Sequence, residues 1–238
     1  MPRWGRVEWF FLACSGILHT VYFLVLLRGY RVADLTVVYP LARGSGPLLS
    51  SLVAVALLGE HLSLLGAAGI AAMVTGVFFV AGGPKIWSGF HAPEYRARIH
   101  KGIAWGLLTG FFIASYTVLD GYAVKVLLVS PVLLDYTGNL VRICVVGPQL
   151  LRDPPATRAL WAKQRKYALA VGVISPVSYV LVLYAAQTAP LSHIAPAREV
   201  SMLFAALIGG QLLGEGDRLA RVLGALLIGV GVVSLALG

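Results

Sequence analysis

Two arginines lie inside long apolar segments of this sequence, Arg43 in YPLARGSG and Arg198 in APAREVS. A charged side chain is costly in hydrocarbon, so an ionisable residue in such a segment is a candidate for a substrate or ion pathway. A guanidinium can also pair with a carboxylate or phosphate through two parallel hydrogen bonds. The two arginines therefore predict a binding site for a substrate that carries an anionic group.

Protein groups could satisfy these arginines instead. Glu199, Asp135 or a backbone carbonyl could pair with one of them, and Arg142 could compete. Proline removes a helical hydrogen bond, so Pro40 and Pro196, which lie just upstream of the arginines, are expected to free carbonyls nearby. The sequence favours the substrate site and leaves internal pairing as the alternative.

Polar and aromatic side chains from several apolar segments are expected to accompany the arginines. A tyrosine in a membrane helix more often anchors at the interface, but Tyr116 and Tyr179 lie well inside their segments. With Arg43 and Arg198, the candidate substrate-binding residues are Tyr39, Ser45, Tyr116, Asn139, Tyr179, His193 and Glu199.

A second pattern, LLGE, also occurs twice and ends in Glu60 and in Glu215. Each glutamate stands just before the next apolar segment, where a carboxylate can accept from the free N–H groups of a helix N-terminus. Helix capping is favoured, and a proton-coupling role is the alternative.

The segments that follow carry small residues at matched positions, Gly69 with Gly76 and Gly224 with Gly231. Small faces let helices approach closely in lipid. Packing is therefore favoured over a surface that slides.

The composition indicates an integral membrane protein. The chain has 238 residues, of which 58% are hydrophobic and 12% charged, and its mean hydropathy is +0.83, whereas soluble domains are about 25% charged. The net charge of +9 comes mostly from residues between the apolar segments, which fits anionic lipid better than nucleic acid. Two isolated cysteines, the histidine spacing and the absence of enzyme signatures predict no metal, no cofactor and no catalytic site.

A membrane-spanning helix needs about 20 mostly apolar residues, and eight segments qualify. They are residues 8–27, 35–58, 62–82, 102–124, 131–151, 167–187, 192–213 and 219–237. The longest links, 83–101 and 152–166, are basic and contain proline, so they are predicted to be solvated loops. The predicted fold class is an all-α, polytopic membrane helix bundle.

The first three segments match the last three. From Arg43 onward an offset of 155 residues pairs Arg43 with Arg198, Glu60 with Glu215 and Gly69 with Gly224. Matching helices are separated by an odd number of crossings, so the two copies run in opposite directions. That is an inverted-topology repeat, as found in secondary transporters. We expect an incomplete first repeat over 1–84, a basic linker loop over 85–101 and a complete second repeat over 102–238, in a 3+5 arrangement.

The segment from YPLARGSG to MVTGVFFVAG and its echo from APAREVS to VSLALG resemble the EamA-type drug/metabolite transporters over nearly the whole chain. The resemblance implies a ten-helix fold of two five-helix repeats, from which the first two helices are absent here. It also implies a central cavity lined by the first, third and fourth helices of each repeat.

The resulting expectation is a secondary transporter, not an enzyme, that moves a small polar metabolite, anionic or amphoteric, by alternating access. The rival interpretations are a flippase for lipids or lipid-linked sugars, and a truncated membrane protein that does not transport. Expected partners are a small-molecule substrate, membrane lipid and a coupling proton or ion. No nucleic acid is expected, and the sequence defines no oligomeric state.

The basic residues also predict an orientation in the cytoplasmic membrane. The side that holds both termini carries Arg3, Arg6 and Lys125. The links on the other side carry Arg28, Arg31, Lys85, Arg96, Arg98, Lys101, Arg152, Arg158, Lys163, Arg165, Lys166, Arg218 and Arg221. Because cytoplasmic loops are enriched in Lys and Arg, both termini are expected on the non-cytoplasmic side.

Overall fold

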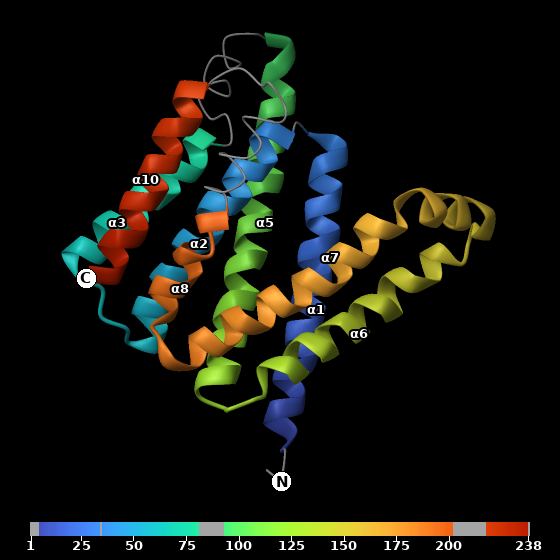
Figure 1. Ribbon diagram of the computed structural model, residues 1–238, viewed down its shortest axis with the longest axis horizontal. Coiled ribbons are helices and arrows are strands. Elements are labelled where there is room, and N and C mark those ends of the chain that lie inside the picture. Colours follow the sequence, from blue (N-terminus) through green and yellow to red (C-terminus); the bar gives the residue numbers. More distant parts are fainter. Residues whose placement is uncertain (1–4, 34, 81–92, 202–217, 238) are drawn as a thin grey trace. The chain divides into compact units, whose positions relative to one another are not determined.

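The computed structural model describes residues 5–33, 35–80, 93–201 and 218–237, and each regular element within these ranges is a helix (Figure 1). In chain order the helices are α1 (Arg6–Val32), α2 (Leu35–Leu58), α3 (Leu64–Val80), α5 (Pro93–Lys125), α6 (Pro131–Leu150), α7 (Pro154–Thr188), α8 (Leu191–Ala197) and α10 (Arg218–Leu237). The all-α class is therefore confirmed for the described part of the chain.

Four of the described helices contain stretches long and apolar enough to cross a membrane. These are Arg6–Val32, Val37–Leu58, Ile99–Lys125 and Pro154–Thr188. Shorter apolar stretches, Leu64–Phe79 and Val222–Leu235, occupy most of α3 and α10. A multi-pass membrane protein is confirmed at this level, and the 3+5 repeat stays a prediction.

The two long basic links were predicted as loops, and for their described residues this was largely wrong. Helix α5 begins at Pro93 and helix α7 at Pro154, so residues 93–101 and 154–166 are helical. Proline is well tolerated in the first turn of a helix, and Asp153 accepts a hydrogen bond of 3.0 Å from the N–H of Ala156. The residues that follow are rich in Ala, Arg, Lys, Leu and Gln, which favour helix. Residues 85–92 lie outside the described ranges.

The segment predicted to be helical over 192–213 begins one residue earlier and is soon interrupted. Helix α8 ends at Ala197, and a turn follows at Arg198 and Glu199. The N–H of Glu199 donates to the carbonyl of Pro196 at 2.9 Å, a shorter loop than the α-helical pattern. By contrast, α2 continues without interruption through Pro40. Residues 200–201 are helical again, and residues 202–213 lie outside the described ranges.

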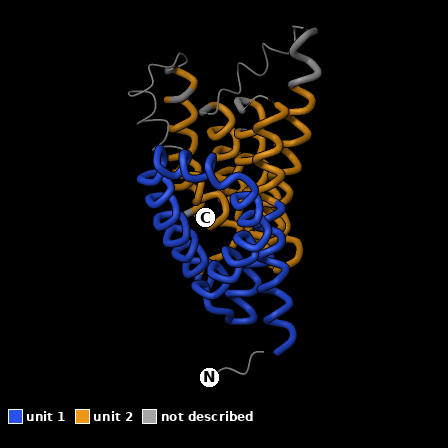
Figure 2. The backbone as a smooth tube through the Cα atoms, turned by 90° about the vertical axis from the view of Figure 1, so that its right-hand side faces the viewer, with its two compact units in different colours: residues 1–21, 119–188 blue, residues 22–118, 189–238 orange. Residues whose placement is uncertain are grey.

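The helices divide into two compact units, each assembled from distant parts of the chain (Figure 2). The first unit contains residues 1–21 and 119–188, and the second contains residues 22–118 and 189–238. In the first unit α6 packs against α7. Helix α1 approaches α6 at Gly16, where an added Cβ atom would stand 2.8 Å from Val141 Cγ2. Helix α1 is therefore held close to α6 in this unit.

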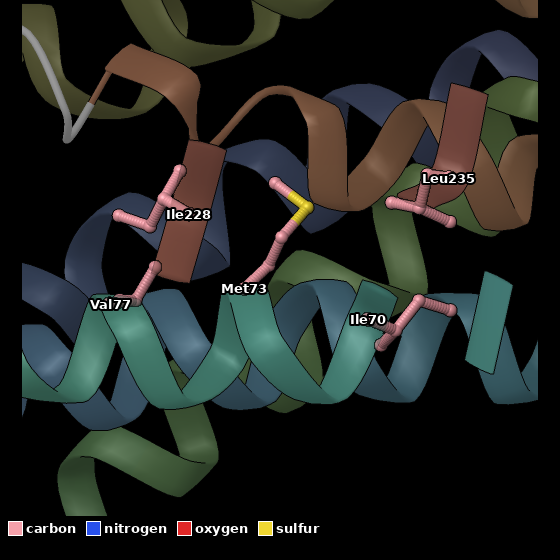
Figure 3. Close-up of a cluster of buried hydrophobic side chains, with 5 residues drawn as sticks. All are labelled: Ile70, Met73, Val77, Ile228 and Leu235. Atoms are coloured by element: carbon pink, nitrogen blue, oxygen red, sulfur yellow. The ribbon is translucent and has the colours of Figure 1, made fainter. Parts of the chain in front are cut away.

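In the second unit α3 packs along α10, and these helices form its apolar core. Figure 3 shows Ile70, Met73 and Val77 of α3 beside Ile228 and Leu235 of α10. The matched glycines lie in this contact. A Cβ atom at Gly69 would stand 2.8 Å from the carbonyl oxygen of Gly231, and one at Gly76 would stand 2.6 Å from that of Gly224. The structure thus places the four glycines in a packing interface.

Helix α2 makes a second close contact, with α5. Three glycines of α5, spaced one turn apart, face α2: a Cβ atom at Gly102 would stand 2.8 Å from Val37 Cγ1, and one at Gly106 2.7 Å from Leu41 Cβ. At Gly110 the added atom would overlap the hydroxyl of Ser45. This stripe of small residues, which the sequence did not bring to notice, lets the α2 backbone lie close against α5.

Glu60, in the link after α2, holds the start of α8. Its two carboxylate oxygens accept hydrogen bonds from the N–H groups of Leu191 at 2.7 Å and Ser192 at 2.8 Å. The hydroxyl of Ser51 donates to the Ser192 carbonyl at 3.0 Å. Glu60 therefore accepts from N–H groups at a helix N-terminus, as the sequence predicts, but this helix is α8; at the start of α3, Ser63 accepts from the N–H of Gly66. Glu215, its repeat partner, lies outside the described residues.

The α3–α10 contact predicts a difference between two glycines. Gly76→Ala should lower the free energy of unfolding by about 1–3 kcal/mol, because the added methyl group meets backbone atoms of Gly224 and Ile228 as well as the Ile228 side chain. Gly172→Ala is the matched control, since no atom lies within 4 Å of its added Cβ. Thermal unfolding in detergent should show a lower midpoint for Gly76→Ala alone. Equal midpoints would contradict the packing described here.

Candidate functional site

The candidate site lies in the second unit and centres on an ion pair between the two repeated motifs. Arg43 of α2 donates from Nη1 to Oε1 of Glu199 at 3.3 Å. The Glu199 side chain is only 6% exposed, whereas that of Arg43 is 35% exposed. A buried carboxylate needs such a partner, because an unpaired buried charge is strongly destabilising. Arg43 therefore neutralises Glu199, which was one of the pairings that the sequence left open.

Arg198 lies close enough to the same carboxylate to interact with it electrostatically. Its Nη1 atom donates to the hydroxyl of Thr117 in α5 at 3.4 Å. The Glu199 carboxylate nevertheless interacts electrostatically with Arg198 as well as with Arg43. Two guanidinium groups thus surround one carboxylate, and this group of three carries one positive charge in excess.

Aromatic rings surround Arg43. Its guanidinium lies over the ring of Tyr39, 5.7 Å from the centroid, in a cation–π contact. Tyr22 and Tyr116 meet edge to face with their centroids 5.4 Å apart, and both interact electrostatically with Arg43. Tyr22 also interacts with Arg198. Three phenol rings therefore accompany the charged groups.

We call these residues the arginine cluster: Arg43, Arg198, Glu199, Tyr22, Tyr39, Tyr116 and Thr117. They come from α1, α2, α5 and the turn after α8, all within the second unit. One acceptor in the cluster remains open, because Oε2 of Glu199 is buried and has no hydrogen-bond partner among the described residues. The cluster can therefore offer guanidinium donors to an anion and a carboxylate oxygen to a cation or donor.

The position of α8 sets the geometry of this cluster. Glu60 accepts hydrogen bonds from the N-terminus of α8, and the helix ends at Ala197, directly before Arg198 and Glu199. Pro196 contributes no N–H, so the last turn lacks one of its hydrogen bonds. In transporters, interrupted helices of this kind place backbone and charged groups next to substrate.

The other predicted residues are not part of this cluster. Ser45 donates its hydroxyl to the Leu41 carbonyl within α2. His193 lies on α8, and its buried Nε2 atom has no hydrogen-bond partner in the described structure.

Asn139 and Tyr179 belong to the first unit. Asn139 donates to Asp135 Oδ2 at 2.9 Å and accepts from Arg142 at 3.3 Å. Tyr179 donates to Asp120 Oδ2 at 2.5 Å. Asp135, considered above as a partner for the arginines, therefore bonds within the other unit.

Sequence reasoning overlooked Tyr22 and Thr117 in the arginine cluster and His19 and Asp120 in the first unit. Tyr22 and Thr117 carry no signal in the sequence, because tyrosine and threonine are both common in membrane helices. His19 and Asp120 did carry a signal, since each is an ionisable residue inside an apolar segment.

Comparison with known proteins identifies a family for this chain. The family model of the EamA-like transporter family matches residues 100–237, which is more than half of the 238 residues. The matched stretch includes most of α5 and all of α6, α7, α8 and α10, and it contains Thr117, Arg198 and Glu199. No curated protein matches the chain. The chain belongs to the EamA-like transporter family.

Proposed function

We propose that this chain is a secondary active transporter that moves a small polar metabolite across the cytoplasmic membrane by alternating access. Membership of a transporter family supports membrane transport as the activity. The observation that carries the proposal is the meeting of two guanidinium groups at one buried carboxylate. Such a group is costly in a membrane protein and is a functional site by default.

The charges of the arginine cluster favour an anionic or amphoteric substrate. The excess positive charge attracts a carboxylate or phosphate, and guanidinium donors suit either group. An amphoteric substrate could also use the open Oε2 atom of Glu199 for its cationic or donor group. A purely cationic substrate would meet two arginines with only one carboxylate between them.

The contacts of Arg43 also suggest how binding could change the conformation. An anionic substrate competes with Glu199 for the guanidinium of Arg43, and Glu199 belongs to the turn that follows α8. A ligand shifts a conformational equilibrium only by its difference in affinity for the two states. Exchange of the Arg43 partner provides such a difference in affinity, because it breaks the ion pair that joins α2 to the turn after α8.

The proposed orientation places both termini on the non-cytoplasmic side. It rests on the excess of Lys and Arg in alternate links. The hydrogen bonds from Leu191 and Ser192 to Glu60 support the alternation, because they join the link after α2 to the link after α7. Both links fall on the same side of the membrane when each long apolar segment crosses once.

Arginine replacements test the substrate site. A thermal-shift screen of the purified protein against amino acids, organic acids and nucleosides would first identify a ligand. Losing one charged hydrogen-bonded pair costs about 1.5–3 kcal/mol, or about a tenfold to hundredfold loss of affinity. Arg43→Lys should weaken binding because an ammonium lacks the planar fork, and Arg198→Leu should nearly abolish it. Titration calorimetry would measure both affinities.

Arg158→Leu is the control for this experiment, because it removes the same charge from an exposed position on α7. It should bind the ligand as the parent does. Unchanged affinity in both cluster variants would place the site elsewhere, and a set of cationic ligands would contradict the charge argument. Movement of fluorescent phospholipids without solute transport in proteoliposomes would favour the flippase interpretation, and neither activity would indicate a protein that does not transport.

Single cysteines test the orientation. In a variant with Cys14 and Cys144 replaced by Ala, Arg158→Cys should react with a membrane-impermeant maleimide only after cells are permeabilised. Lys125→Cys is the matched control, an exposed basic position at the end of α5, and should react in intact cells. The reverse pattern would show that the termini lie in the cytoplasm.

A further inference from the structure

The first unit contains a buried group of ionisable side chains that the proposed substrate site does not use. Nε2 of His19 in α1 lies 2.8 Å from Oδ2 of Asp120 in α5. Tyr179 of α7 donates its hydroxyl to the same oxygen at 2.5 Å, and its ring meets that of His19 edge to face at 5.1 Å. We call His19, Asp120 and Tyr179 the histidine cluster.

Burial makes this cluster costly. The Asp120 side chain is 1% exposed and that of His19 is 13% exposed. The second oxygen of Asp120, Oδ1, is buried and has no hydrogen-bond partner in the part of the chain that the structure describes. A membrane protein that needed only packing at this position could use apolar side chains, because replacing a buried charged pair by apolar residues is often neutral or stabilising.

Other charged groups face the cluster from α6. Asp135 interacts electrostatically with His19, with Asp120 and with Arg142. Asp135 also accepts a hydrogen bond of 2.9 Å from Asn139. The close approach of α1 and α6 at Gly16 explains this proximity, because His19 and Asp135 each lie about one turn from the contact between Gly16 and Gly138. Asp120 of α5 and Asp135 of α6 thus face His19, and Arg142 of α6 lies near Asp135.

We propose that the histidine cluster binds the proton that couples to transport, an inference that rests on the proposed transport function. Imidazole can take up and release a proton near neutral pH, and chains of Asp, Glu and His within membrane segments serve as proton relays in transporters. A proton from the aqueous phase on one side binds to the His19 ring. The ring then forms an imidazolium–carboxylate pair with Asp120, and the same proton is later released on the other side.

The charge balance explains why this step can matter inside a membrane. With neutral imidazole and ionised Asp120, the histidine cluster has a net charge of −1, and one added proton brings it to zero. Asp135 and Arg142 carry opposite formal charges, so as a pair they add nothing to this difference. The unprotonated cluster therefore buries a net charge of −1, whereas the protonated cluster buries none. This difference in buried charge can favour one conformation over another.

The experiment uses the full chain in vesicles of phosphatidylethanolamine and phosphatidylglycerol that contain the pH-sensitive dye pyranine. The probe is a defined mixture of the twenty common amino acids with lactate, malate and citrate, in unlabelled and radiolabelled form. Counterflow of the labelled mixture reports solute exchange without a proton gradient, and the dye reports proton movement when the mixture is added. The parent protein should show both.

His19→Gln and Asp120→Asn should keep counterflow and reduce proton movement to that of protein-free vesicles. Tyr179→Phe keeps the His19–Asp120 pair and should give an intermediate proton signal. His61→Gln and Tyr184→Phe are the matched controls, because both positions are exposed, and they should behave as the parent.

Three results would overturn the inference. His19→Gln and Asp120→Asn could move protons as the parent does, or they could lose counterflow together with proton movement, which would assign the histidine cluster to packing. The parent could also exchange solutes without moving protons, which would remove the coupling role and leave transport intact. Absence of counterflow in the parent would instead overturn the transport function itself, and the coupling role with it.

Discussion

A carboxylate buried in an apolar protein has to be neutralised where it lies, and Glu199 imposes this requirement on the second unit. Arg43 satisfies it from α2 with a hydrogen bond of 3.3 Å. Removing one partner of a buried ion pair costs about 3–5 kcal/mol, so this pair holds α2 beside the turn after α8 until another group replaces one of the partners. Glu60, in the link after α2, binds the N-terminus of α8 at the other end of that helix. Helix α8 is thus held at both ends by glutamate.

This arrangement connects the fold to the proposed activity. Arg43 pairs with Glu199, and Arg198 adds a second positive charge beside the same carboxylate while donating to the hydroxyl of Thr117. Charged groups gathered inside an apolar protein break the local rule of apolar packing, and such departures are expected at functional sites. The glycine contacts between α3 and α10 and between α2 and α5 let the backbones approach closely in each case. In the proposed mechanism these contacts position the cluster, and the Arg43 partner changes.

The sequence predicted the elements better than the partners. Hydropathy located α2 over the same residues as the structure. An apolar segment that crosses a membrane forms a helix because its backbone N–H and C=O groups can only bond within the segment. It misjudged residues 93–101 and 154–166, because basic helical turns and basic loops look alike in composition. The repeated arginines were visible as unusual charges, but the choice of Glu199 over Asp135 as a partner depends on tertiary contacts.

The same limit applies to individual side chains. Glu60 was expected to cap a helix, yet its target lies far along the chain, at Leu191 and Ser192. Asn139 and Tyr179 were grouped with the arginines because they are polar residues in apolar segments, and the structure assigns them to the first unit. Spacing within a helix can be inferred from sequence, whereas contacts between helices depend on rotations that residue type alone does not determine.

The central claim is that the arginine cluster recognises a negative charge on the substrate. The most direct test compares the affinity of a carboxylate ligand found by screening with that of its primary amide, which has nearly the same shape without the charge. The account predicts that the amide binds about tenfold to hundredfold more weakly, because it loses a charged hydrogen-bonded pair. Equal affinities of the acid and the amide would contradict it.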